Sequence, residues 1–167
     1  MAVTQTMWIH GSSVQLENSQ IGNGSQLHSL QRLGFFTIVK GFDHDPTNED
    51  PGAGNWYHFS ISTPMRPSGE PTRLKAVMLR ARGIGAILRS IHVWDGDHNV
   101  ERKDGLELLL GDDKKDLSVH RFDIAGAPKI RFAVGVSARF TLGVLSGLGQ
   151  TMTPGVLKLI AAGAEFA

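Results

Sequence analysis

Tryptophan and histidine occur in this chain in a repeated pairing. Each of the three tryptophans has a histidine two positions away. The pairs are Trp8 with His10, Trp56 with His58, and His92 with Trp94. Residues two positions apart in a β-strand point to the same side of the sheet, so each pair would present an indole ring beside an imidazole.

Three kinds of site could use such pairs. An indole face stacks on a sugar ring while the imidazole donates or accepts hydrogen bonds, which indicates a carbohydrate-binding surface. Alternatively, His10, His58 and His92 could converge as ligands for zinc or another divalent metal ion. Asp95 would then be a fourth ligand, or would accept a hydrogen bond from one of these histidines. Tryptophan is also common in protein interfaces, and the alternative without a ligand is that the pairs fill the partly polar side of a β-sandwich.

Sequence motifs for catalysis are absent. The chain has no P-loop, no H-E-x-x-H and no G-x-S-x-G, so no catalytic residues are expected. Asp95, Asp97 and Asn99 match the first ligands of an EF-hand calcium loop, but Val100 and Leu106 replace its glycine and glutamate. Asp-Gly between two apolar runs is typical of a type I′ hairpin turn instead. The acidic stretch 43–50 is expected to be a solvated loop, with a hard cation as the alternative ligand.

The composition limits the remaining classes. The chain has 167 residues, no cysteine, 41% apolar residues and a formal net charge of +1. This length predicts a single domain over residues 1–167, and the lack of cysteine excludes disulfides and thiolate metal sites. The near-neutral charge gives no reason to expect a nucleic-acid partner. Basic residues in the middle of the chain are expected to form a solvated face: Arg80, Arg82, Arg89, Arg102 and Lys103.

The N-terminal residues lack the basic and apolar regions of a signal peptide, and no apolar run is long enough for a membrane helix. The default expectation is therefore a cytoplasmic protein, with export without a leader left open.

The elements that must position these residues have the period of strands. About nine short strands are expected, at 13–17, 33–40, 56–62, 74–82, 86–94, 105–110, 118–124, 129–142 and 156–166. This spacing predicts an all-β fold, an antiparallel β-sandwich of jelly-roll type. In 129–142 one face is apolar and should be buried: Ile130, Phe132, Val134, Val136, Ala138 and Phe140. The segment 41–55 is expected to be a long loop.

A glycine-rich segment at 143–155 carries apolar side chains where a loop should be polar. They would form an exposed patch on a monomer: Leu142, Val144, Leu145, Leu148, Met152 and Val156. Such a patch predicts an interface between copies of the chain, with a plug over one end of the sandwich as the equal alternative.

Four short stretches carry a resemblance to a family. They are Met7-Trp8-Ile9-His10-Gly11 followed by Val14 and Glu17, then residues 56–64 as W-[FY]-H-F-x-I-x-T-P, residues 91–96 as V-[HY]-V-[WY]-D-G with Ile91 in place of the first valine, and residues 162–166 as A-G-[AV]-[DE]-F. The chain resembles a family of small uncharacterised bacterial proteins along nearly its whole length. The resemblance implies a jelly-roll β-sandwich and no established activity.

The function expected from sequence is that of a non-enzymatic, soluble β-sandwich protein that acts by self-assembly, as a homo-oligomer, or by binding a protein. The alternatives are a carbohydrate-binding module that uses the Trp/His pairs and a cupin-like protein with a His-ligated divalent metal ion. Cupins place two histidines and a glutamate in one strand-turn-strand unit, and this chain lacks that cluster.

Overall fold

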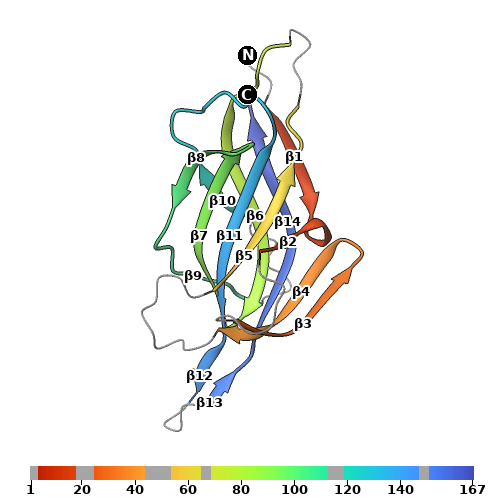
Figure 1. Ribbon diagram of the computed structural model, residues 1–167, viewed down its shortest axis with the longest axis vertical. Helices are drawn as coiled ribbons and strands as arrows, with labels where there is room; N and C mark the ends of the chain where they lie inside the picture. The colour runs from red at the N-terminus through yellow and green to blue at the C-terminus, as the bar shows by residue number, and fades with distance from the viewer. Residues whose placement is uncertain (1–3, 18–24, 44–53, 65–68, 113–118, 147–150) are drawn as a thin grey trace.

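The computed structural model describes residues 4–17, 25–43, 54–64, 69–112, 119–146 and 151–167. Within them the chain forms two six-stranded antiparallel sheets that pack face to face (Figure 1). The predicted antiparallel β-sandwich is confirmed. Among the described residues, no helix is long and apolar enough to cross a membrane.

The first sheet, sheet A, is built around the long strand β14 (Gly155–Phe166). Its strand order is β10 (His120–Asp123), β6 (Leu74–Ile84), β14, β4 (Phe36–Asp43) and β3 (Ser25–Leu33). One edge of β14 pairs with β6, while the other pairs with β4 over its first half and with β1 (Gln5–His10) over its second half. The strand expected at 156–166 is thus present, and its apolar residues fill the centre of a sheet.

The second sheet, sheet B, has strands in the order β2 (Gln15–Leu16), β5 (Asn55–Ile61), β11 (Val134–Leu142), β7 (Ala86–Asp95) and β8 (His98–Lys103), and β9 (Leu108–Leu109) also pairs with β7. In β5, the alternate residues Tyr57, Phe59 and Ile61 are buried in the core. Trp56 and His58 therefore lie on the outer face of the sheet.

The core lies between the two sheets and draws on both. Its large, fully buried side chains include Leu74, Leu79 and Leu157 from sheet A, and Tyr57 and Phe140 from sheet B. The Tyr57 and Phe140 rings meet edge to face, with centroids 5.6 Å apart.

Between β1 and β2 the chain turns in a short 3-10 helix, η1 (Gly11–Ser13), where a strand over 13–17 was expected. Gly11 lies directly against β14, and a Cβ atom there would be 2.0 Å from the Leu159 carbonyl oxygen. The Thr37 hydroxyl donates a hydrogen bond to the Gly11 carbonyl over 3.0 Å. Only glycine fits where η1 approaches β14 this closely.

The predicted strand 129–142 is shorter in the structure, since β11 begins at Val134. Ile130 is buried as expected, but Phe132 is 71% exposed, so its assignment to the core was wrong. The Asp95 carboxylate accepts hydrogen bonds from the backbone N–H groups of Arg131 and Phe132, over 2.9 and 2.8 Å, and holds these residues out of the strand ladder.

The turn after Asp95 also differs from the expected type. β7 and β8 are joined by Gly96 and Asp97, since Asp95 pairs with His98. Gly96 has a φ of +63°, whereas Asp97 is not among the described non-glycine residues with positive φ. Positive φ at the first loop residue alone fits a type II′ turn rather than type I′.

The segment predicted as a glycine-rich loop at 143–155 contains a hairpin, β12 (Val144–Ser146) and β13 (Thr151–Thr153). The hairpin extends beyond one end of the sandwich (Figure 1). Leu142 is only 4% exposed and belongs to the core, so its place in an exposed patch was wrong. Leu148 and residues 44–50 of the acidic stretch lie outside the described residues.

Candidate ligand-binding surfaces

Two of the three Trp/His pairs meet on the outer face of sheet B. The Trp56 and His92 rings, from β5 and β7, have centroids 4.6 Å apart, and those of His92 and Trp94 are 6.4 Å apart. Together with His58 and Ser137, these three side chains form what we call the sheet-B cluster: Trp56, His58, His92, Trp94 and Ser137. The histidines and tryptophans of the cluster are half-buried.

Ser137 on β11 joins the two pairs, because β11 lies between β5 and β7. In the strand register Ser137 is opposite His58 on one side and His92 on the other. Its hydroxyl oxygen lies 2.9 Å from His58 Nδ1 and accepts the Trp94 indole N–H over 3.2 Å. Sequence reasoning did not single out Ser137, since its position depends on how three separate strands are aligned.

Charged groups surround the cluster. The Arg139 guanidinium lies over the Trp56 ring at 5.6 Å, and that of Arg102 lies 6.0 Å from the Trp94 ring. His92 Nε2 is 2.9 Å from an Asp104 carboxylate oxygen. The hydrogen bond to His92 holds the pKa of Asp104 below its usual value.

A pocket of about 250 Å³ opens beside this cluster. His58, Trp94 and Ser137 line it together with Ser13 and Gln15 from the chain after β1. Its floor includes Gly135, where a Cβ atom would be 3.3 Å from that of Trp94.

The third pair, Trp8 with His10, lies on the outer face of sheet A. Trp8 is 45% exposed. Its indole lies over Gly163 of β14, where an added Cβ atom would be 2.7 Å from Trp8 Cε3. The three pairs therefore do not converge on one site, because β1 belongs to a different sheet from β5 and β7.

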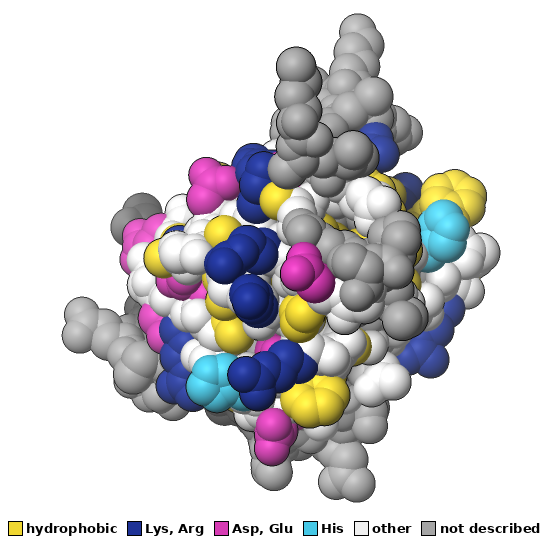
Figure 2. Space-filling view, turned by 90° about the horizontal axis from the view of Figure 1, so that it is seen from above, with side chains coloured by type: hydrophobic (Ala, Val, Ile, Leu, Met, Phe, Trp, Pro, Cys, Tyr) yellow, Lys and Arg dark blue, Asp and Glu magenta, His cyan; other side chains and the backbone are white. Residues whose placement is uncertain are grey.

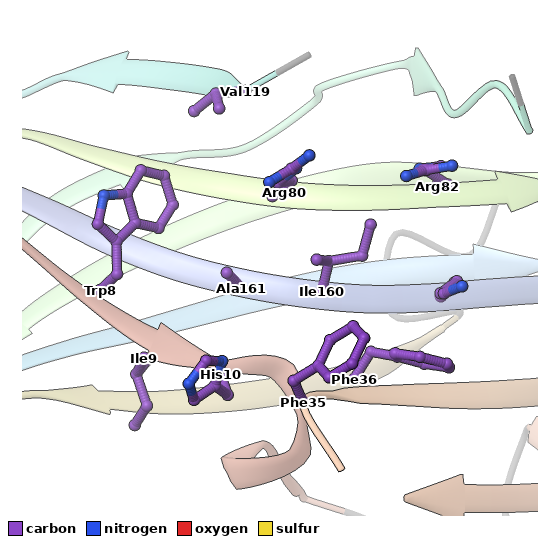
Figure 3. Close-up of a pocket in the computed structure, with 11 residues that line it drawn as sticks. Trp8, Ile9, His10, Phe35, Phe36, Arg80, Arg82, Val119, Ile160 and Ala161 are labelled. Carbon is purple, nitrogen blue, oxygen red and sulfur yellow. The ribbon is translucent and has the colours of Figure 1, made fainter. Parts of the chain in front are cut away.

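Trp8 and His10 line a second pocket, of about 560 Å³, which is larger than the one beside the sheet-B cluster (Figure 3). We call it the sheet-A pocket. Its lining residues are Trp8, Ile9, His10, Phe35, Phe36, Arg80, Arg82, Val119, Lys158, Ile160 and Ala161.

The strand register explains the hollow shape. Ala161 of β14 lies between His10 of β1 and Arg80 of β6, so a small side chain is flanked by two long ones. Figure 3 shows Trp8 at one end of the pocket, Phe35 and Phe36 toward the other, and the two arginines along β6. The floor is thus low and apolar, and the walls are aromatic or basic.

The sequence-based metal site is not assembled. His10 lies on the opposite sheet from His58 and His92, and the Asp95 carboxylate is occupied by two backbone N–H groups. Among the described residues there is no group of three or more His, Asp or Glu side chains placed to hold a metal ion.

The end of the molecule seen in Figure 2 has a mixed surface, with Lys and Arg side chains in a column and Asp and Glu side chains beside them. On sheet A, Arg121 is paired with both Glu165 and Asp123. The hydrogen bond from Arg121 holds the pKa of Glu165 below its usual value.

Several pocket residues were missed or misjudged from sequence. Arg80 and Arg82 were expected on a solvated face. No motif or spacing in the sequence marked Phe35, Phe36 or Lys158 as binding residues. Alternation does place Arg80 and Arg82 on one face of β6. The pocket arises only when β1, β4, β6 and β14 are laid side by side.

Fold and surfaces together define a β-sandwich protein with an aromatic and polar site on the outer face of each sheet. Residues 2–166 match the model of a family of unknown function, DUF6623, and the chain belongs to this family. The expectation that the chain belongs to an uncharacterised family is therefore confirmed.

Comparison with curated proteins found no match. Among solved structures, the chain is similar to one described as "Carbohydrate binding module family29", with 9% sequence identity and a TM-score of 0.43. The match covers 98% of this chain and 90% of that one. At this level of similarity it says nothing about what this chain binds.

Proposed function

We propose that this protein is a binding module that takes a saccharide in the sheet-A pocket. The observation that carries the proposal is the pocket of about 560 Å³ with the exposed Trp8 indole at one end and the Phe35 and Phe36 rings toward the other. Aromatic faces stack on the C–H faces of sugar rings, and side-chain N–H groups beside them donate to sugar hydroxyls.

The lining supports binding of a ring-shaped polar ligand. Trp8 is held over Gly163, and Phe36 is held between Phe35, at 5.0 Å between ring centroids, and the Lys158 ammonium, at 3.9 Å. Aromatic side chains fixed in this way lose little conformational freedom when a ligand stacks on them. His10, Arg80 and Arg82 add hydrogen-bonding groups along the walls.

The test is a glycan array with the full chain, followed by calorimetric titration of the best ligand. Trp8→Ala is expected to weaken binding about tenfold or more, as for a central aromatic contact. Trp56→Ala, on the opposite face, is the matched control and should change the affinity less than about twofold. Absence of binding to any saccharide, or loss of binding in the Trp56 variant alone, would overturn the proposal.

Self-association is a second candidate, favoured by the end of the sandwich that bears the β12–β13 hairpin. The hairpin projects from the body as a two-stranded sheet with open edges (Figure 1). Ile84 of β6 and Leu109 of β9 are exposed apolar side chains. Open edges and apolar patches favour association with a second copy of the chain.

Light scattering on the eluting protein tests this candidate. We expect the full chain to form a dimer or larger assembly, and a variant with residues 144–153 replaced by a short Gly-Ser turn to be monomeric. A monomeric full chain at high concentration contradicts self-association and leaves the sheet-A pocket unaffected.

A further inference from the structure

We propose that the sheet-A pocket selects a negatively charged saccharide, one with carboxylate or sulfate groups, over a neutral one. The proposal rests on the saccharide-binding function above and adds the charge of the ligand.

The charges that line the pocket have one sign. Arg80, Arg82 and Lys158 contribute cationic side chains, and no described lining residue is Asp or Glu. The chain as a whole is nearly neutral, with a formal net charge of +1. The positive lining is therefore a local feature of this pocket and not a consequence of a basic protein.

The register places two of these cations directly opposite each other. Arg82 of β6 pairs with Lys158 of β14, and both side chains lie on the outer face. Like charges directly opposite each other in an antiparallel pair destabilise the sheet. An anion bound near this pair would interact favourably with both cations.

Arg80 differs from Arg121 of the same sheet, because no ion pair links it to an acidic side chain among the described residues. Arg121 is paired with Glu165 and Asp123, whereas Arg80 forms no ion pair among the described residues and its Nε has no hydrogen-bond partner there. A guanidinium presents a planar set of donors that matches a carboxylate or sulfate. Arg80 is thus available to orient toward an anionic group in the pocket.

Aromatic and cationic side chains are arranged so that one ligand can contact both. Trp8 lies at one end and Phe35 and Phe36 toward the other, while along β6 Arg80 lies between them and Arg82 lies at the Phe36 end (Figure 3). A sugar ring stacked on Trp8 would direct an acidic substituent toward Arg80. A chain of acidic sugars fits this arrangement better than a single inorganic anion, which would not use the rings.

The test is calorimetric titration with matched pairs of oligosaccharides that differ in charge. The pairs are an oligogalacturonate with its methyl ester, and a sulfated oligosaccharide with its desulfated form. In at least one pair we expect the acidic member to bind about tenfold or more tightly than the neutral member, with affinity falling as salt rises. Arg80→Gln should remove most of that preference while leaving neutral binding within about twofold.

Arg102→Gln on the outer face of sheet B is the matched control and should leave both affinities unchanged. Lys158→Gln is a second pocket variant if Arg80→Gln does not fold, as judged by circular dichroism. Equal or tighter binding of the neutral member in every pair that binds would overturn the charge selection and leave the saccharide function standing. Absence of binding by every saccharide would overturn both, as would complete competition by inorganic sulfate with no effect of Trp8→Ala.

Discussion

Asp95 shows how a residue that suggested metal binding acts on the fold. It is 6% exposed, and both carboxylate oxygens accept backbone N–H groups, from Arg131 and Phe132. These bonds tie the end of β7 to the segment that leads into β11, and so help to set the alignment of the strands that carry Trp94 and Ser137. A carboxylate with this role is a structural cap rather than a ligand.

Replacing Asp95 with Ala should lower the free energy of unfolding by about 2–4 kcal/mol, because two backbone donors lose their acceptors. Asp97→Ala, in the exposed turn two residues later, should change it by less than about 0.5 kcal/mol. Urea unfolding measures both. Equal effects of the two substitutions would contradict the capping role.

Gly11 is required by its distance from β14. Gly11→Ala should destabilise the protein by about 3 kcal/mol, because the new Cβ would meet the Leu159 carbonyl at 2.0 Å and the backbone must shift. Gly111→Ala is the matched control, since no atom lies within 4 Å of its Cβ position. Thermal unfolding of both variants checks this, and similar melting temperatures would count against the close approach.

At the scale of elements, strand β7 shows how one strand serves both the core and a surface. Ile91 and Val93 point into the core, while His92 and Trp94 join the sheet-B cluster. β11 places Ser137 between β5 and β7, and His92 also contacts Asp104, which follows β8. The cluster is therefore a product of three strands, and its electrostatics depend on their alignment.

The Asp104–His92 contact predicts a specific dependence on pH. Since the folded pKa of Asp104 is lowered, its carboxylate stabilises the fold above the unfolded pKa, near 4, and this contribution is lost as pH falls through the lower folded value. His92→Ala should return the pKa of Asp104 toward its usual value, as followed by NMR titration of the carboxyl carbon.

Glu165 provides the control in the same spectra. Its pKa is lowered mainly by Arg121, and both residues lie on sheet A, so it should not respond to the substitution of His92 on sheet B. An unchanged Asp104 titration in His92→Ala would show that another group causes the shift.

At the scale of the whole molecule, both sheets contribute to one core. Leu79 and Leu157 from sheet A belong to the same buried cluster as Tyr57 and Phe140 from sheet B. The outer faces are separated by this core, so the two pockets, each lined by an indole and an imidazole, do not share side chains of these types. A single domain over residues 1–167 stays a prediction.

A single domain should unfold in one cooperative step. Trp8 reports on sheet A, whereas Trp56 and Trp94 report on sheet B, so Trp8→Phe and a Trp56→Phe, Trp94→Phe double variant separate the two signals. We expect the fluorescence transition of each to coincide with its own circular dichroism transition in urea. Two separated transitions within one variant would contradict the single domain.

The fold class followed from the sequence because the period of two is a local property. Residues 56–62 and 86–94 alternate strongly enough to predict strands, and the same alternation placed Trp56 with His58 and His92 with Trp94 on common faces. Where a long-range contact interrupts the period, as Asp95 does at Arg131 and Phe132, the local pattern misled.

Composition and periodicity by themselves determined an antiparallel β-sandwich, the faces of its main strands and a set of paired tryptophans and histidines. Only the tertiary structure decided that Trp56, His92 and Ser137 meet while Trp8 lies on the other sheet beside Arg80 and Lys158. The physical reason is that alternation specifies which side a residue faces, whereas the partners of a strand are set by packing among segments far apart in the chain.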